Sequence, residues 1–231
     1  MPTITLIRHG QASFGAANYD QLSDLGQVQS RHLGEVLRER GEPVDAVFMG
    51  AMQRHRQTAE ACLAAAGLAH LPAQVLPGFN EFNHEQVIER YEPRYRDRAW
   101  LNEQMAAHER PGEIFAQFFN AAVHRWIDGR HDDEYDESWR QFQTRVRAAL
   151  DQAFETLGPR GHALVFTSGG CIANVAQSLL ALDDMTTFRL NISLANAGFS
   201  RITQGRDRRS LASLNEHSHF SGRHRHLLTW R

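Results

Sequence analysis

Three short polar clusters each follow an apolar run that is typical of a buried strand. The clusters are Arg8-His9-Gly10, Arg54-His55-Arg56 and Ser168-Gly169-Gly170. Open α/β sheets place their ligand sites just beyond the carboxyl ends of their strands. A single histidine after a strand is more often a structural hydrogen-bonding residue. The shared location of the three clusters nevertheless favours one site built from all of them.

The chemistry that these residue types support is attack on phosphorus by a histidine. A neutral imidazole is nucleophilic near pH 7 when a hydrogen bond at one ring nitrogen aims the other nitrogen. We expect His9 to be the nucleophile, with Arg8 and Arg54 holding the oxygens of the phosphoryl group. Backbone amides at the start of the helix after Gly170 would add an uncharged anion cradle. Such a site needs no metal ion and no other cofactor.

The elements that must position these clusters alternate between strands and helices. Apolar patterning predicts strands at residues 3–7, 45–49, 74–76, 163–166, 199–203 and 211–214. Helical spacing predicts helices at residues 25–37, 52–66, 142–154 and 172–180. Ser23 and Gly41 are the expected caps of the first helix. This alternation indicates an α/β fold.

A region of different character interrupts the alternation. From about residue 83 to 135, charged and aromatic residues crowd together, and a helix is expected around residues 113–127. We interpret this region as a helical cap insertion in a single domain that spans residues 1–231. Its stretch from Arg90 to Trp100 has the basic and aromatic residues of a nucleic-acid patch. Interspersed acidic residues favour a cap helix of mixed charge instead.

The composition narrows the function classes. The chain has 231 residues with 25 Lys+Arg against 27 Asp+Glu, and it contains no lysine, so every fixed positive side chain is an arginine. A Walker-type phosphate loop and a Schiff-base enzyme both need a lysine and are excluded. Arginine alone still binds phosphate strongly, two oxygens at a time. The net charge of -2 gives no general attraction to nucleic acid.

No segment predicts export or membrane insertion. The apolar run before Arg8 is too short for a secretory signal, and no stretch approaches the roughly 18 apolar residues that span a bilayer. We therefore expect a cytoplasmic protein. Cys62 and Cys171 fall in helical patterns and are expected to be buried free thiols. The histidines and arginines of residues 216–226 lack metal-site spacing and indicate a solvated tail or a lid.

Three motifs follow one another in a specific order: Leu6-Ile7-Arg8-His9-Gly10, Leu22-Ser23-Asp24-Leu25-Gly26-Gln27-Val28-Gln29 and Met52-Gln53-Arg54-His55-Arg56-Gln57-Thr58-Ala59. Together they resemble the histidine phosphatase superfamily, often called phosphoglycerate mutase-like. The resemblance implies a three-layer α/β/α fold with a mainly parallel sheet, a phosphohistidine at His9, and phosphate clamps at Arg8 and Arg54. It also implies that Glu81, ahead of the insertion, protonates the leaving oxygen and then activates water.

Two departures from the family pattern bear on activity. The family usually carries a second histidine where this chain has Ser168, so a charged contact to phosphate becomes a hydroxyl. A charge-assisted hydrogen bond is worth roughly 1.5–3 kcal/mol, so we expect slower catalysis or a changed site. By sequence, His84 is the nearest candidate to compensate, with an exposed loop histidine as the alternative. In the first loop, Gln11 or Ser13 would replace an asparagine that many relatives use to touch the phosphate.

The leading hypothesis is a metal-independent phosphatase that hydrolyses a phosphomonoester through phospho-His9. Its expected phosphate-binding residues are Arg8, Arg54, Ser168 and Gly169. A phosphoglycerate mutase-like phosphotransferase is the second alternative, but the lysine-bearing insertion motif of the mutases cannot occur without lysine. A phospho-ligand binding protein of weakened activity is the third, motivated by Ser168. The expected partner is a small phosphorylated substrate or phosphate, rather than nucleic acid or a membrane.

Overall fold

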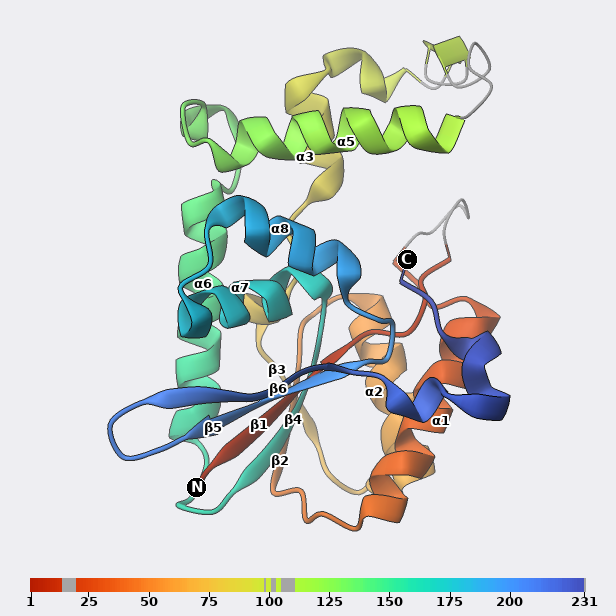
Figure 1. The fold of residues 1–231 in the computed structure, drawn as a ribbon, viewed down its shortest axis with the longest axis vertical. Coiled ribbons are helices and arrows are strands. Elements are labelled where there is room, and N and C mark those ends of the chain that lie inside the picture. The colour runs from red at the N-terminus through yellow and green to blue at the C-terminus, as the bar shows by residue number, and fades with distance from the viewer. Residues whose placement is uncertain (14–19, 98, 101–102, 105–110, 231) are drawn as a thin grey trace. The chain divides into compact units, whose positions relative to one another are not determined.

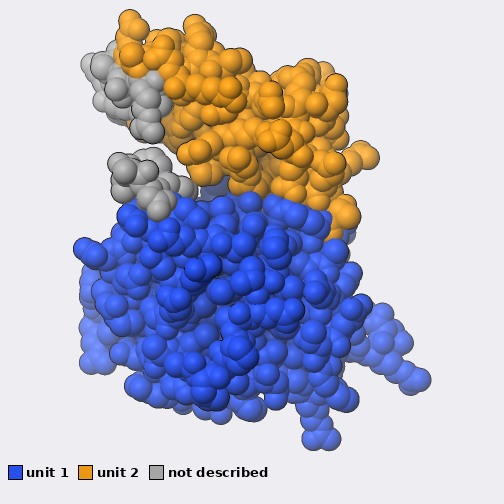
Figure 2. Space-filling view, turned by 180° about the vertical axis from the view of Figure 1, so that it is seen from behind, with its two compact units in different colours: residues 1–81, 145–231 blue, residues 82–144 orange. Residues whose placement is uncertain are grey.

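The computed structural model (Figure 1) describes residues 1–13, 20–97, 99–100, 103–104 and 111–230. The chain divides into two compact units, which Figure 2 shows in different colours. Unit 1 comprises residues 1–81 and 145–231, and unit 2 comprises residues 82–144. The predicted insertion falls within unit 2, and its residues 98, 101–102 and 105–110 lie outside the described part of the chain.

The described residues of unit 1 form one six-stranded sheet with the order β3-β2-β4-β1-β5-β6 (Figure 1). Its parallel part contains β1 (Thr3–Arg8), β2 (Ala46–Met49), β3 (Ala73–Val75) and β4 (His162–Thr167). Two antiparallel strands complete it, β5 (Phe199–Gln204) beside β1 and β6 (Arg209–Glu216) beside β5. The predicted mainly parallel sheet is therefore confirmed.

Helices cover both faces of the sheet (Figure 1). Along the chain, the strands step across the sheet in one direction from β1 to β2 and on to β3. The next strand, β4, lies back in the opposite direction, between β2 and β1. Right-handed crossovers therefore place α1 (Asp24–Arg40) and α2 (Gln53–Ala66) on one face and α6 (Trp139–Glu155) on the other. Two further helices, α7 (Gly169–Leu180) and α8 (Asp184–Ser193), connect β4 to β5. Sequence patterning did not predict α8.

The capping residues of α1 are those that the sequence predicts. The hydroxyl of Ser23 accepts a hydrogen bond from the amide of Gly26 at 3.1 Å, which satisfies one of the unpaired amides at the start of the helix. Such an N-cap contributes about 1 kcal/mol. At the other end Gly41 adopts the left-handed conformation, with φ of 62°, where glycine has no side chain to strain. The helix that follows the His9 loop therefore has both of its ends fixed.

The C-terminal tail was predicted to be solvated or a lid; several of its charged and histidine side chains are exposed, but apolar residues anchor it. The tail forms two short helices, η4 (Ser218–Phe220) and η5 (Gly222–Leu227). Phe220 and Leu227 are buried in the same apolar cluster as residues of α1, α2 and the sheet. The side-chain amide of Gln29, in α1, donates to the carbonyl oxygen of Leu227 at 2.6 Å. The many histidines and arginines of the tail masked these two apolar anchors.

Unit 2 contains α3 (His84–Tyr91) and α5 (Pro111–Ile127), and the latter confirms the helix predicted at residues 113–127. Its core is aromatic. The ring centroid of Trp126 lies 4.8 Å from that of Phe82 and 5.2 Å from that of Trp139. Aromatic rings at such separations pack favourably edge to face or offset. The unit therefore has an apolar core of its own.

Other predictions concern thiols, membranes and metals. Cys62 and Cys171 are buried free thiols, as predicted, and burial raises the pKa of each to about 12. Such thiols are unreactive at neutral pH. Within the described ranges, no helix is long and apolar enough to cross a membrane. The same residues contain no group of histidine, cysteine and carboxylate side chains arranged to hold a metal ion.

Candidate active site

His9 stands directly after β1 and is 5 % exposed. Its Nδ1 lies 2.7 Å from the carbonyl oxygen of Gly10. Because a carbonyl can only accept, Nδ1 carries the proton and donates it, which leaves the lone pair on Nε2. A histidine whose tautomer is fixed in this way presents one defined nucleophilic nitrogen.

The surroundings of His9 keep its ring neutral. Burial is the main cause that holds the pKa of His9 well below its ordinary value of 6.5, followed by the positive charges of Arg54 and Arg8 and by the ring of His55. Both burial and neighbouring positive charge disfavour the protonated form. At neutral pH the Nε2 lone pair is therefore available.

The loop after His9 is held by close backbone packing. A Cβ atom on Gly10 would lie far inside contact distance of the carbonyl oxygen of Gly26, so α1 packs directly on this backbone. The amide of Gly10 donates to the hydroxyl of Thr58 at 3.1 Å, and that hydroxyl donates to the carbonyl oxygen of Arg54 at 2.7 Å. Residues from all three sequence motifs therefore meet behind His9.

Arg54, the second residue of α2, is buried next to the His9 loop and is 3 % exposed. Its guanidinium donates to one carboxylate oxygen of Asp20 at 2.7 Å. The other oxygen of Asp20 accepts from the amide of Gln53 at 2.9 Å, at the amino end of α2. Asp20 therefore orients Arg54 and caps the helix at once, a role that no sequence pattern predicted.

Arg8, the last residue of β1, is anchored by backbone oxygens. Its guanidinium donates to the carbonyl oxygens of Leu194 and Trp230, the latter at 3.3 Å. A Cβ atom on Gly169 would lie 3.5 Å from Nε of Arg8, so the guanidinium borders the first residue of α7. The structure thus places two of the predicted phosphate-binding residues, Arg8 and Gly169, side by side.

The loop that carries Glu81 is fixed through its backbone. One guanidinium nitrogen of Arg145, in α6, donates to the carbonyl oxygens of Gly78 at 3.0 Å and Asn80 at 2.7 Å. The hydroxyl of Thr167 donates to the carbonyl oxygen of Phe79 at 2.7 Å. Sequence reasoning did not assign these two supporting residues. A rigid loop of this kind holds the Glu81 carboxyl group in a defined position.

The carboxyl group of Glu81 lies against Gly170. Its Oε2 atom accepts a hydrogen bond from the amide of Gly170 at 2.9 Å. A Cβ atom at Gly170 would collide with Oε1, so only glycine leaves room for the carboxyl group here. The anion cradle was predicted at the start of the helix after Gly170, and it stays a prediction. The amide of Gly170 itself binds the carboxyl group of Glu81.

The side chain of Ser168 contacts the imidazole of His55, which the sequence reasoning named in a cluster but gave no role. Nε2 of His55 lies 2.6 Å from Oγ of Ser168, and both residues are 0 % exposed. The ring centroids of His55 and His9 are 5.9 Å apart. Burial, and then the charge of Arg54, hold the pKa of His55 well below 6.5. Its place in the buried helical stripe with Ala59 was the available signal.

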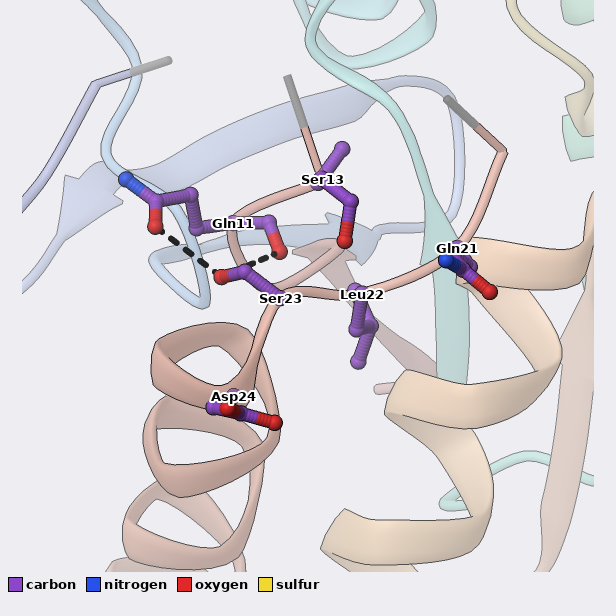
Figure 3. A pocket seen from close by; sticks show the side chains of 7 residues that line it. Gln11, Ser13, Gln21, Leu22, Ser23 and Asp24 are labelled. Carbon is purple, nitrogen blue, oxygen red and sulfur yellow. Dashed lines mark hydrogen bonds between the residues drawn. The ribbon is translucent and has the colours of Figure 1, made fainter. Parts of the chain in front are cut away.

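Gln11 and Ser13 line a cavity of about 720 Å³ beside the amino end of α1 (Figure 3). The hydroxyl of Ser23 donates to the side-chain oxygen of Gln11 at 2.9 Å, as Figure 3 shows. The backbone amide of Ser13 donates to the carbonyl oxygen of Gln21 at 2.8 Å. A role of Gln11 or Ser13 in phosphate binding stays a prediction.

Three consecutive residues tie the candidate site together. Ser168 contacts His55, Gly169 borders Arg8, and Gly170 binds the carboxyl group of Glu81. His9 and Arg54 adjoin the same group through the ring of His55 and through Thr58. His84, the predicted compensating residue, opens α3 in unit 2, and its role stays a prediction. The observed imidazole partner of Ser168 is His55.

The sequence is similar to those of known proteins. Residues 4–217 match the family described as the histidine phosphatase superfamily (branch 1). An 80-residue stretch is 34% identical to a phosphoglycerate mutase of Candida albicans (strain SC5314 / ATCC MYA-2876). That match covers 32% of this chain and 32% of the relative, so the chain spans about a third of the curated relative that it matches.

Solved structures share the fold. A phosphoglycerate mutase from Bacillus anthracis str. Sterne is similar with a TM-score of 0.64 and 19% identity, over 94% of each chain. A phosphoserine phosphatase mutant from Entamoeba histolytica, in complex with phosphoserine, has a TM-score of 0.63 and 15% identity, over 96% of this chain and 100% of that one. Mutases and phosphatases thus share this fold, so the fold alone does not assign the reaction.

Proposed function

The chain belongs to the histidine phosphatase superfamily, and on that premise we propose that it is a metal-independent phosphatase. It hydrolyses a phosphomonoester in two steps through a phosphohistidine at His9. The observation that carries this proposal is the hydrogen bond from Nδ1 of His9 to the Gly10 carbonyl oxygen, 2.7 Å long, together with the burial of the ring. These features leave a neutral Nε2 as the nucleophile.

In the first step, Nε2 of His9 attacks phosphorus, an N–P bond forms, and the P–O bond to the leaving group breaks. Glu81, as a carboxylic acid, gives its proton to the leaving oxygen. Arg8 and Arg54 stabilise the charge that spreads over the remaining phosphoryl oxygens. The products of this step are the free alcohol, phospho-His9 and the Glu81 carboxylate.

In the second step, water attacks the phosphorus of phospho-His9. The Glu81 carboxylate takes one proton from that water, the N–P bond breaks, and phosphate leaves. Both His9 and Glu81 then return to their starting states. The backbone contacts of the Glu81 loop with Arg145 and Thr167 support this double role, because the same carboxyl group must serve both steps.

A phosphotransferase is the second candidate, favoured by the 34% identity to a phosphoglycerate mutase over 80 residues. In it, phospho-His9 passes its phosphoryl group to an alcohol instead of water. The absence of lysine from the sequence weighs against it, since the lysine-bearing insertion motif of the mutases is missing. The replacement of the usual second histidine by Ser168 motivates a third candidate, a phospho-ligand binding protein of weakened activity.

One set of assays separates the three candidates. The wild-type protein is incubated with 4-nitrophenyl phosphate, with and without a chelator, and separately with 2- and 3-phosphoglycerate. Hydrolysis that a chelator leaves unchanged, and that His9→Ala abolishes, supports the phosphatase. Interconversion of the two phosphoglycerates without net phosphate release supports the mutase. If neither occurs while inorganic phosphate still raises the melting temperature, the binding protein replaces both. A screen of small phosphorylated metabolites and phosphopeptides then addresses the substrate.

A further inference from the structure

His55 and Ser168 form a buried pair inside the candidate site, 2.6 Å apart between Nε2 and Oγ. The family resemblance places a second histidine at position 168, and here the imidazole comes from α2 instead. We propose that the pair does the work of that histidine, with His55 holding the Ser168 hydroxyl as a hydrogen-bond donor to the phosphoryl group. This inference rests on the proposed function, and it adds His55 as a positioning residue.

The position of the His55 proton follows from its surroundings. Nδ1 of His55 is buried and has no hydrogen-bond partner among the described residues. A buried N–H without an acceptor is rarer than a buried acceptor without a donor. The proton is therefore on Nε2, which donates to Oγ of Ser168. The hydroxyl hydrogen of Ser168 is then directed away from His55 and can be donated to another acceptor.

The location of Ser168 gives that hydroxyl hydrogen a target. The two residues after Ser168 border Arg8 and bind Glu81, the groups that hold the phosphoryl oxygens and the leaving group in the proposed reaction. A donor at the start of this turn therefore lies beside the reacting group. A hydrogen bond to the developing negative charge stabilises the transition state more than the ground state.

The proton on Nε2 of His55 also argues against a role of Ser168 as the nucleophile. A serine hydroxyl becomes a nucleophile when a neighbouring imidazole accepts its proton. With the proton already on Nε2, the ring of His55 cannot accept one from Ser168 at that nitrogen. Ser168 is therefore a donor, and the phosphorylated residue remains His9. The two roles leave different products, because phosphohistidine is labile to acid and phosphoserine is stable to it.

The first experiment compares His55→Phe, Ser168→Ala and the double variant in steady-state hydrolysis of 4-nitrophenyl phosphate. Each single variant should lower kcat about tenfold to a hundredfold with little change in KM, since the lost hydrogen bond acts in the transition state. The double variant should be no slower than Ser168→Ala, because the two residues act as one unit. His55→Gln, which restores a donor near the place of Nε2, should recover much of the loss.

Wild-type kcat for His55→Phe, or a double variant slowed by the product of the two single effects, would overturn the inference. So would equal losses for His55→Gln and His55→Phe at unchanged melting temperature, or acid-stable phosphate on Ser168. If the wild type itself shows no turnover, the proposed function fails separately. The pair is then judged by calorimetric affinity for inorganic phosphate, which Ser168→Ala and His55→Phe must each weaken about tenfold.

A reciprocal exchange tests whether the two positions share one imidazole. A histidine side chain at position 168 would have to enter the space where Nε2 of His55 lies 2.6 Å from the serine oxygen. Ser168→His alone should therefore lower both kcat and the melting temperature. Adding His55→Ala removes the ring already present, and kcat should rise at least about tenfold above that of Ser168→His. No recovery in the double variant, with the single variant stable and slow, contradicts the exchange.

Discussion

Two arginines in different regions of the molecule form ion pairs of similar length in very different environments. The side chain of Arg54 in unit 1 is 4% exposed and pairs with Asp20 at 2.7 Å. The side chain of Arg94 in unit 2 is 65% exposed and pairs with Glu92 at 2.8 Å. The distances are alike, but an exposed pair is screened by water and contributes little. Pairing distance therefore does not identify the arginines that matter to function.

Other polar side chains of the two units differ in exposure in the same way. In unit 1, His9, His55 and Ser168 are buried together around Arg54, so each polar group depends on the others. In unit 2, the side chain of His131 is 40% exposed and pairs with Glu134 at 2.8 Å, where water can replace either partner. Matched substitutions in the two regions should therefore have very different consequences.

The largest difference is expected between His9→Asn and His131→Asn. Loss of the nucleophile should lower kcat by at least about a thousandfold, because both chemical steps pass through His9. The exposed His131→Asn should stay within about twofold of the wild type. Initial rates of 4-nitrophenyl phosphate hydrolysis test this, with melting temperatures to show that both variants fold. Equal rates for the two variants would remove His9 from the mechanism.

The second comparison sets Glu81→Gln against Glu92→Gln. Without the general acid, kcat should fall about a hundredfold to ten-thousandfold for an alkyl phosphate. The loss should be smaller for 4-nitrophenyl phosphate, whose leaving group needs less protonation. Glu92→Gln should show neither effect. Phosphate release from both substrates measures the ratio, and equal losses for the two leaving groups contradict a general acid at this position.

The third comparison replaces the two arginines themselves. Arg54→Ala should lower kcat/KM about tenfold to a hundredfold, because a charge-assisted contact to the phosphoryl group is lost. It should also lower the melting temperature, since it leaves Asp20 without this partner at the start of α2. Arg94→Ala should change neither by much. A stable Arg54→Ala variant with wild-type kcat/KM would show that Arg54 is structural only.

The smallest expected effect is on the pH dependence of the free energy of unfolding. In the folded chain the pKa values of His9 and His55 are lowered below 6.5, mainly by burial. Their contribution to stability is therefore complete above pH 6.5 and is lost as the pH falls below it, because the unfolded chain takes up protons first. When the pH falls from 7.5 to 5.5, each of these two histidines should lower the free energy of unfolding by up to about 1.4 kcal/mol.

Urea denaturation at the two pH values measures this loss, and His55→Phe should reduce it. The exposed region supplies the contrast, because the hydrogen bond from Arg94 holds the pKa of Glu92 below its ordinary 4.5, outside this pH range. Glu92→Gln should therefore leave the pH dependence unchanged. A wild-type free energy of unfolding that does not fall between pH 7.5 and 5.5 would mean that the buried histidines are not kept neutral.

Much of the fold follows from local pattern. The strands around His9 and Ser168 are short, buried apolar runs, and the caps Ser23 and Gly41 bracket α1 where the sequence places them. The α8 helix was missed because its apolar residues lack a clear helical stripe. The anchoring of the tail was missed because its charge density outweighed Phe220 and Leu227. Both errors concern segments whose position depends on tertiary packing more than on local sequence.

In the candidate site, too, some residues could be identified from the sequence and others only from the structure. Residues within the contiguous motifs, such as His9 and Arg54, were named because their chemistry and spacing are visible along the chain. His55 was named beside Arg54 but was given no role, because its partner Ser168 lies 113 positions away. Asp20 and Arg145 were also missed, since their contacts are likewise long-range. Sequence reasoning therefore finds the proposed reacting groups more readily than the groups that hold them.

Identification of the residue that is phosphorylated during turnover tests the proposed mechanism most directly. The wild type, His9→Asn and Ser168→Ala are mixed with 32P-labelled substrate, parallel samples are quenched in alkali and in acid, and peptides are mapped by mass spectrometry. We expect phosphate on His9 that is stable in alkali and lost in acid, present in Ser168→Ala and absent from His9→Asn. Acid-stable phosphate on Ser168, or undiminished turnover in His9→Asn, would contradict this mechanism.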